Sequence, residues 1–227
     1  MSKKYSNFLT IILVLVIIAI IGIIAFLGYK YYQTYVTKSS SEDFVGSFVE
    51  DSENNENNST EKGNTNIADD DGMFDGIEES SNEGGASGSN VKKYNGFVVA
   101  GTIEIPATNL RCPILAKSEY SQKALETSVV ELYGDGLNQV GNTTIAGHNY
   151  RNGTFFSNNK KLNVGDKIYI TDLTGKRLSY TIYDKFEAED NYSDYMIRDT
   201  QGAIEISLST CTDDSKARLI ILAKANV

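Results

Sequence analysis

The 227-residue chain has no tryptophan, two prolines, two cysteines and one histidine. Two cysteines are too few for a disulfide-stapled secreted scaffold. The ligand spacings that mark zinc sites, such as Cys-x-x-Cys and His-x-x-x-His, do not occur, so we expect no metal site. Any chemistry that needs a thiol or an imidazole must therefore use Cys112, Cys211 or His148.

Charge is distributed unevenly along the chain. Residues 1–38 carry four lysines and no acid, residues 39–90 carry fourteen acids and one lysine, and residues 91–227 balance sixteen bases against sixteen acids. The net charge of −9 therefore comes from the middle segment. A neutral C-terminal region gives no electrostatic reason to expect nucleic-acid binding.

A run of twenty uncharged residues, Phe8 to Leu27, lies near the N-terminus. As a helix it spans about 30 Å, the thickness of the hydrocarbon core of a bilayer. A cleaved signal peptide is the alternative, but the run exceeds the ~7–15 residues of such a signal and no Ala-x-Ala-like site follows it. Tyrosines and a lysine follow instead, as at a membrane interface. We predict an uncleaved anchor over residues 8–29.

The regions that flank this anchor differ in size and composition. The short tail, residues 1–7, favours a single pass through the cell membrane with the N-terminus in the cytoplasm and the large C-terminal part extracellular. Residues 30–92 are rich in Ser, Asn, Gly, Asp and Glu. Their low apolar content cannot offset the entropy of ordering, which predicts a disordered, acidic tether. The remaining residues, 93–227, are predicted to form the folded domain.

Residues 93–227 show the alternation and the β-branched content of strands. Turn signals separate the best candidates, and a helix is predicted only from Tyr120 to Leu132. Short strands at regular spacing predict a mainly all-β fold, a barrel or a sandwich. The strand candidates are residues 97–105, 142–148, 167–173, 178–187, 203–210 and 218–225.

Three chemically versatile side chains lie at the ends of these strands. His148 follows one apolar strand, Cys211 ends another, and Arg218 opens the last. Only six residues separate Cys211 from Arg218, which predicts a hairpin with the thiol and the guanidinium at one rim. A thiolate can attack a carbonyl, an imidazole can protonate a leaving amine, and a guanidinium can stabilise an oxyanion. A single strand-end Cys is, however, more often a small packing residue.

Several motifs resemble those of the sortase family. Ser207-Leu208-Ser209-Thr210-Cys211 is similar to the family's Thr-Leu-x-Thr-Cys strand, with Ser in place of the first Thr. Residues 141–148 resemble its histidine strand, and Arg218 stands where the family has its arginine. The resemblance covers most of residues 97–224, and further similar segments are residues 105–114, 154–156 and 162–168.

The resemblance implies an eight-stranded β-barrel with one or two short helices, and the activity of a cysteine transpeptidase. Such an enzyme cleaves a C-terminal sorting signal after Thr, holds the product as a thioester on Cys211 and transfers it to a peptidoglycan-linked amine. No cofactor is needed. The implied partners are surface proteins that bear the signal, the amine of a peptidoglycan precursor or cross-bridge, and the membrane. The implied catalytic residues are His148, Cys211 and Arg218, and the implied substrate-binding residues are Thr210, Asn149 and Ser209.

The subclass is ambiguous in the sequence. The residues around His148 and Cys211 resemble class B members, but Cys211 follows 63 positions after His148. This spacing is too short for the extra helix that class B members usually carry. The Asp-Pro motif of pilus-building members does not occur, which disfavours pilin polymerisation. The type of sorting signal remains open.

Three alternatives compete with this interpretation. A disulfide between Cys112 and Cys211 would block the nucleophile, although Cys112 before Pro113 suits a small packing residue. The domain could be a non-catalytic binding module held at the cell surface by its tether. It could also be a cysteine peptidase that only hydrolyses its substrate.

Overall fold

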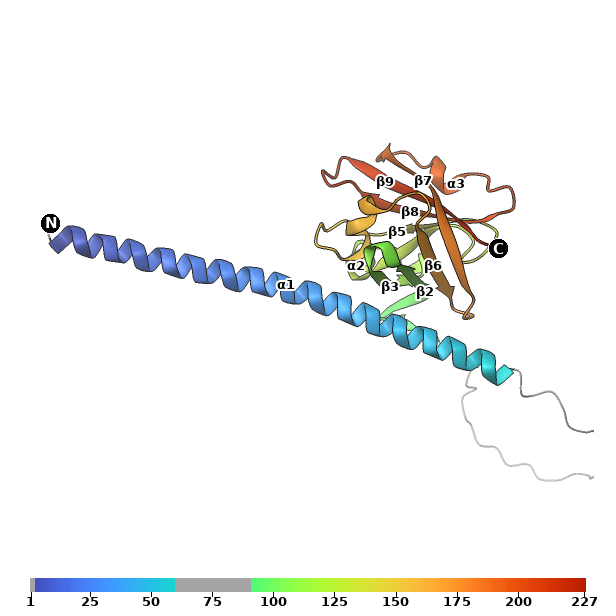
Figure 1. Ribbon diagram of the computed structural model, residues 1–227, viewed down its shortest axis with the longest axis horizontal. Helices are drawn as coiled ribbons and strands as arrows, with labels where there is room; N and C mark the ends of the chain where they lie inside the picture. The colour runs from blue at the N-terminus through green and yellow to red at the C-terminus, as the bar shows by residue number, and fades with distance from the viewer. Residues whose placement is uncertain (1–2, 60–90) are drawn as a thin grey trace, which may run out of the picture.

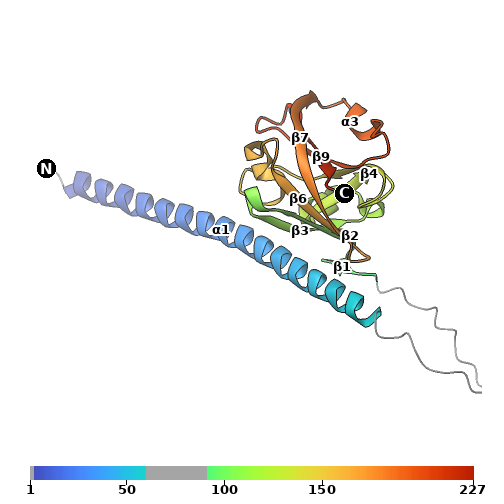
Figure 2. The same ribbon diagram turned by 45° about the vertical axis from the view of Figure 1, so that its right-hand side comes forward.

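The computed structural model describes residues 3–59 and 91–227, and it places a long helix beside a β-barrel (Figures 1 and 2). The helix is α1 (Lys3–Ser59), and the barrel contains two further short α-helices, α2 (Gln122–Thr127) and α3 (Asp194–Ile197). Short 3₁₀ turns are η1 (Pro106–Thr108), η2 (Lys117–Glu119) and η3 (Phe155–Lys161). The strands are β1 (Lys93–Tyr94), β2 (Phe97–Ile105), β3 (Leu110–Leu115), β4 (Val129–Tyr133), β5 (Gly141–Ala146), β6 (Lys167–Asp172), β7 (Arg177–Glu189), β8 (Ile204–Cys211) and β9 (Ala217–Ala225).

The sheet has the order β1-β2-β3-β4-β5-β8-β9-β7-β6, and an additional pairing of β2 with β6 closes it. Strands β2 to β9 therefore form a closed eight-stranded barrel, with the two-residue β1 added outside β2. Most neighbours are antiparallel, whereas β3–β4 and β5–β8 are parallel. Closure removes the exposed sheet edges that promote aggregation. The predicted mainly all-β, eight-stranded barrel with a few short helices is confirmed.

The barrel interior is filled by apolar side chains that alternate with outward-facing ones along each strand. Ile103 of β2, Ile145 of β5, Tyr180 of β7 and Leu208 of β8 are each completely buried in one continuous core. Alternation of this kind is what a strand with one face on the core requires. The six predicted strands correspond to β2, β5, β6, β7, β8 and β9.

The helix predicted from Tyr120 to Leu132 is only half correct. Ser121 caps the helix, because its Oγ accepts a hydrogen bond from the Ala124 amide, but α2 covers only Gln122–Thr127. The remaining residues form β4, where Val129 and Val130 are completely buried. Pairing with β3 on one side and β5 on the other supplies more hydrogen bonds and burial than another helical turn would.

The structure also corrects the predicted tether, because residues 30–59 are helical as part of α1. Phe44, Val45 and Phe48 have the spacing of one helix face. Val45 and Phe48 are buried, and Phe44 and Phe48 pack on a second core of the barrel that includes Tyr94 and Leu115. Burying a side chain of this size contributes roughly 1.5–3 kcal/mol, which orders a segment that is otherwise polar. The rest of the predicted tether, residues 60–90, lies outside the described residues.

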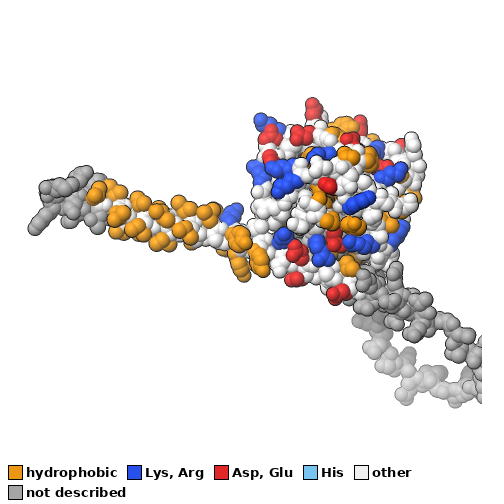
Figure 3. Space-filling view, in the orientation of Figure 1, with side chains coloured by type: hydrophobic (Ala, Val, Ile, Leu, Met, Phe, Trp, Pro, Cys, Tyr) orange, Lys and Arg blue, Asp and Glu red, His pale blue; other side chains and the backbone are white. Residues whose placement is uncertain are grey.

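The stretch of α1 from Ile11 to Leu27 is apolar on all sides. Its side chains form an uninterrupted hydrophobic band that stands clear of the barrel in Figure 3, and those from Ile11 to Leu27 are exposed. Among the described residues, α1 is the one helix that is long and apolar enough to cross a membrane. It is therefore a candidate membrane span.

Candidate active site

Two parallel strands bring His148 and Cys211 to the same end of the barrel. Ala146 of β5 is aligned with Ser209 of β8, and the Gly147 amide donates to the Ser209 carbonyl at 3.1 Å. His148 and Cys211 are each two residues beyond that aligned pair. Neighbouring parallel strands keep this offset, so the sheet register itself brings the imidazole and the thiol together.

Gly147 is the residue that lets the histidine strand approach the core this closely. A Cβ atom at this position would lie 2.7 Å from Phe156 Cδ2 and 2.8 Å from Val129 Cγ1. Both neighbours are fully buried and have no room to move. The requirement for glycine is therefore steric, and it fixes the backbone from which His148 projects.

Cys211 and Arg218 are directly opposed in the predicted hairpin of β8 and β9. Arg218 Nη1 donates to Cys211 Sγ at 2.9 Å, and Arg218 Nη2 lies 2.6 Å from Asp190 Oδ1. The guanidinium is thus held between the thiol and a carboxylate. The contact therefore places a positive charge directly beside the sulfur atom.

His148 is half-buried and contacts one aromatic neighbour, Tyr150, and one polar neighbour, Gln122. Its ring centre lies 4.9 Å from that of Tyr150, and its Nε2 lies 3.4 Å from Gln122 Nε2 of α2. Burial lowers the pKa of His148; the Glu126 carboxylate opposes this shift, and the Arg218 guanidinium adds to it. The neutral imidazole is therefore favoured near neutral pH and can accept a proton.

Two cavities flank Cys211. The first, of about 250 Å³, is lined by His148, Cys211 and Arg218 together with apolar side chains such as Leu125 and Met196; we call it the His148 cavity. The second, of about 370 Å³, has Cys211 in its wall together with charged groups that include Lys160; we call it the Lys160 cavity. A peptide that crosses Cys211 therefore meets a cavity of mixed polar and apolar lining on each side, with Asp190 and Arg218 in the first and Lys160 in the second.

The side chains of the predicted substrate-binding residues differ in whether they already have hydrogen-bond partners. Thr210 is buried, lines both cavities, and its Oγ1 has no hydrogen-bond partner within the described part of the chain. Ser209 lines the His148 cavity, and its Oγ accepts from Tyr195 Oη at 3.1 Å. Asn149 is already committed, because its amide donates to the Cys211 carbonyl and to Asp213 Oδ1 at 3.0 Å each.

Asn149 also links two segments that surround the thiol. These are the loop of residues 147–154, which follows β5, and the turn of residues 212–216, which joins β8 to β9. Arg151 Nη2 donates to Ser215 Oγ at 3.1 Å and forms a second link between them. We call these two segments together the Cys211 rim.

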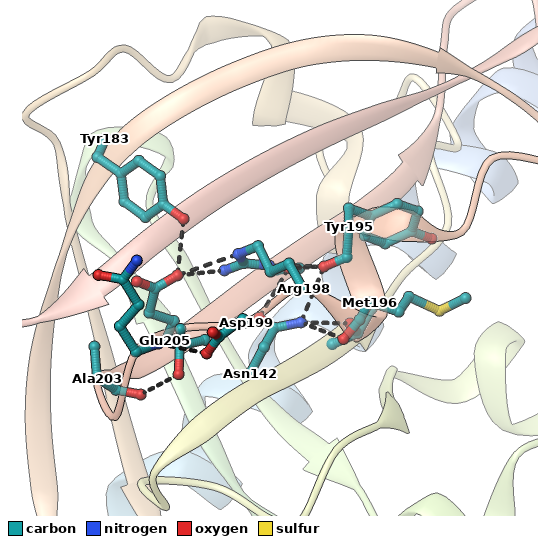
Figure 4. Close-up of polar contacts among 12 residues, drawn as sticks. Asn142, Tyr183, Tyr195, Met196, Arg198, Asp199, Ala203 and Glu205 are labelled. Atoms are coloured by element: carbon teal, nitrogen blue, oxygen red, sulfur yellow. Dashed lines mark hydrogen bonds and ion pairs between the residues drawn. The ribbon is translucent and has the colours of Figure 1, made fainter.

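A buried polar cluster supports the wall of the His148 cavity from behind (Figure 4). Arg198 pairs with Glu205 of β8 at 2.7 Å, and it also donates to the Tyr195 carbonyl at 2.7 Å and to Ser207 Oγ at 2.6 Å. Asn142 of β5 donates to that same Tyr195 carbonyl at 3.1 Å. These bonds fasten α3, which carries Tyr195, onto the two central strands.

Sequence reasoning missed Gln122, Asp190 and the Arg198–Glu205 pair. Asp190 and Arg198 lie in the segment between β7 and β8, which has no strand or motif pattern of its own. Gln122 falls within the predicted helix, but nothing in the sequence indicates which of its faces meets His148. Only the closure of the barrel brings these residues to the site.

Both cysteines are free, which excludes the alternative disulfide between them. Cys112 is buried in the main core, and burial raises its pKa to about 12. It therefore packs as a small apolar residue, as predicted. Within the described residues, no group of three His, Cys, Asp or Glu side chains is arranged to hold a metal ion.

Comparison with known proteins decides the family. A model of the sortase domain matches residues 103–226, which is more than half of the chain. The chain belongs to the sortase family. Sortase A of Bacillus anthracis is 31% identical over 134 residues, which cover 54% of this chain and 58% of that protein. The chain therefore matches somewhat more than half the length of this curated relative.

Solved sortase structures agree with this assignment. Sortase A from Corynebacterium diphtheriae, in a lid mutant, is 26% identical with a TM-score of 0.52, covering 58% of this chain and 72% of that one. A sortase D5 transpeptidase from Clostridium perfringens is 28% identical with a TM-score of 0.52, covering 60% and 83%. In this sortase, the residues between His148 and Cys211, 149–210, contain η3 and the four-residue α3, and no longer helix.

Proposed function

We propose that this sortase is a membrane-anchored cysteine transpeptidase that uses Cys211 as nucleophile, His148 as general acid and base, and Arg218 as oxyanion stabiliser. The observation that carries the proposal is the 2.9 Å contact of Arg218 Nη1 with Cys211 Sγ, in the wall of the cavity that also contains His148. These three groups supply the nucleophile, the proton carrier and the positive charge that acyl transfer requires.

In the first half-reaction the Cys211 sulfur attacks the carbonyl carbon of the Thr in the sorting signal. His148 accepts the thiol proton and passes it to the amine of the next residue as the C–N bond breaks. Arg218 stabilises the negative oxygen of the tetrahedral intermediate. The product is a thioester between Thr and Cys211, and the free amine leaves.

In the second half-reaction a peptidoglycan-linked amine attacks the thioester carbonyl. His148 takes the proton of the attacking amine and returns it to the departing Cys211 sulfur. An amide bond replaces the thioester, so atoms and charge balance without a cofactor. Thr210 supports this role because its buried, unpartnered hydroxyl lies between both cavities and is available to a bound peptide.

The proposed arrangement in the cell follows the apolar helix. Residues 8–29 anchor the chain in the cell membrane, residues 1–7 lie in the cytoplasm, and residues 93–227 form the extracellular catalytic domain. The proposed partners are surface proteins that bear a C-terminal sorting signal. Ser209 belongs to the proposed peptide-binding wall, whereas Asn149 acts by holding the Cys211 backbone, because its amide is already bonded there.

The test uses the full chain in detergent micelles with a panel of sorting-signal peptides and hydroxylamine as acceptor. We expect one peptide to yield a hydroxamate at its Thr, read by mass spectrometry. Cys211→Ala should abolish this product, whereas Cys112→Ala, the matched change at the other cysteine, should retain it. Hydrolysis without hydroxamate would instead indicate a peptidase, and no turnover with a free Cys211 thiol would favour a binding module.

A further inference from the structure

α1 runs without interruption from its apolar half into the part that packs on the barrel. It is helical from Lys3 to Ser59. Its backbone hydrogen bonds join each turn to the next, so the two halves share one axis. The anchor and the barrel are therefore connected by a rigid element and not by a flexible chain.

The contacts between α1 and the barrel follow an order along the helix. Nearest to the apolar stretch, Thr34 Oγ1 accepts from Asn152 Nδ2 at 3.4 Å. One turn further, Lys38 shares the wall of a small cavity with Thr154. Phe48 comes last, almost three turns beyond, and is buried in the second core. The loop that follows His148 is thus the part of the barrel that lies closest to the apolar stretch.

The same end of the barrel carries the whole Cys211 rim. In Figures 1 and 2 the loop after β5 and the turn between β8 and β9 both lie on the side that faces the N-terminal half of α1. The opposite end carries the β6–β7 turn, where Leu173 is 56% exposed. The two ends of the barrel are therefore at different heights along the helix axis.

The height of the rim above the lipid follows from the helix rise. The apolar run ends at Leu27, and Thr34 is one to two turns further, about 10 Å along the axis. The polar layer on each side of a ~30 Å hydrocarbon core is roughly 5–7 Å thick. We propose that α1 is a rigid mount that holds the Cys211 rim beside the lipid surface.

This inference concerns geometry and does not depend on the catalytic roles of the rim residues. Its consequence for substrates rests on the proposed function. A thiol held at a fixed, small height reaches peptide segments that lie next to the lipid, such as the part of a membrane-held protein that emerges from the bilayer. It does not reach the same segment displayed far from the surface.

The test measures the height of two labelled sites in the full chain. A fluorophore is attached at Lys216→Cys in the Cys211 rim, or at Leu173→Cys at the opposite end, each in a Cys211→Ser background. Cys112 is buried and does not react with the label. The proteins are placed in phosphatidylcholine vesicles that contain a lipid with a nitroxide on its headgroup. We expect several-fold stronger quenching at position 216 than at position 173.

A break in the helix supplies the control. Tyr31→Pro with Tyr32→Gly interrupts α1 between the apolar stretch and the first contact at Thr34, at exposed positions that leave Phe48 in place. It should remove the difference in quenching, whereas Tyr31→Ala with Tyr32→Ala should preserve it. Equal quenching at both sites in the unbroken helix, or a difference that survives the break, would overturn the proposal. Neither readout requires turnover, so its failure is separable from failure of the proposed chemistry.

Discussion

Arg218 and Cys211 face each other across the β8–β9 hairpin, so their 2.9 Å contact is fixed by strand register and not by a mobile loop. The planar guanidinium uses one amino group for the thiol and the other for Asp190, at 2.6 Å. A lysine ammonium is a single point charge and cannot reproduce both contacts with the same geometry.

Arg218→Lys should therefore retain the fold and lose most of the activity. We expect kcat/KM to fall by about 10²–10³, the usual cost of removing one oxyanion donor. Steady-state cleavage of a sorting-signal peptide measures the loss, and an unchanged thermal midpoint verifies that the barrel is intact. Activity within a factor of two or so of the native value would show that positive charge alone suffices.

His148 is the only histidine, so its ring proton gives one assignable NMR titration. Its midpoint should lie below the ordinary value of 6.5, because burial disfavours the charged ring. Glu126→Gln should lower the midpoint further, and Arg218→Gln should raise it, because the two neighbours act with opposite sign. If both substitutions shift the midpoint in the same direction, the assigned causes are incorrect.

The same shift predicts how stability depends on pH. The folded state binds the His148 proton less tightly than the unfolded state does. Stability therefore decreases as pH falls from the unfolded-state pKa near 6.5 to the lower folded-state pKa. Urea unfolding of the native chain and of His148→Gln across this range should show a steeper decline for the native chain. Parallel curves would mean that His148 does not contribute.

The two thiols should differ sharply in reactivity. Cys112 is 1% exposed and its pKa is raised to about 12, whereas Cys211 is partly exposed. A thiol reagent should modify one cysteine per native chain and two in denaturant. Cys211→Ser should abolish the native reaction and leave one reactive thiol in denaturant. Fast modification of that variant under native conditions would indicate that the core around Cys112 opens readily.

The buried polar cluster behind α3 should be essential for stability. Arg198→Met leaves the Glu205 carboxylate without its ionic partner, and such a loss costs about 3–5 kcal/mol. Tyr183→Phe removes a single neutral donor to the same carboxylate and should cost about 1 kcal/mol. Urea unfolding measures both values. Equal costs for the two changes would show that water or another group compensates Glu205.

Phe48 should stabilise the barrel although it lies far outside the segment that matches the sortase model. Phe48→Ala removes a ring that is 1% exposed and should lower the free energy of unfolding by about 3–5 kcal/mol. Ser47→Ala, an exposed neighbour, should change it by less than about 0.5 kcal/mol. If Phe48→Ala leaves the unfolding free energy unchanged, α1 does not dock on the barrel in solution.

Strands with clear alternation were predictable, and those with mixed signals were not. Ile204, Ile206 and Leu208 alternate with polar residues in β8, and the β-branched Thr143, Thr144 and Ile145 indicated β5. Both runs form the expected strands. β3 was missed because it contains Pro113, and proline usually marks a strand edge or a loop. Val129 and Val130 follow a good helix sequence, and only their pairing on both sides makes them a strand.

The part of the site that lies at strand ends was predictable from the sequence. His148, Cys211 and Arg218 all stand where an apolar run stops or starts, and the hairpin followed from the short connection. Asp190 was not predictable, because its contact with Arg218 depends on the path of the segment after β7. The packed half of α1 was missed because its few apolar residues are flanked by Ser, Asp and Glu, and their burial depends on a surface formed by distant strands.

The parallel pairing of β5 with β8 has a consequence for the timing of activity. His148 and Cys211 are brought together by two strands that are distant in sequence. Such strands pair late and slowly during folding, because the chain must first lose the entropy of closing the long loop between them. A partly folded chain therefore carries the Cys211 thiol without the His148 imidazole beside it. Enzymatic competence should appear in a single step with completion of the β-barrel, so that folding itself acts as the switch that turns the enzyme on.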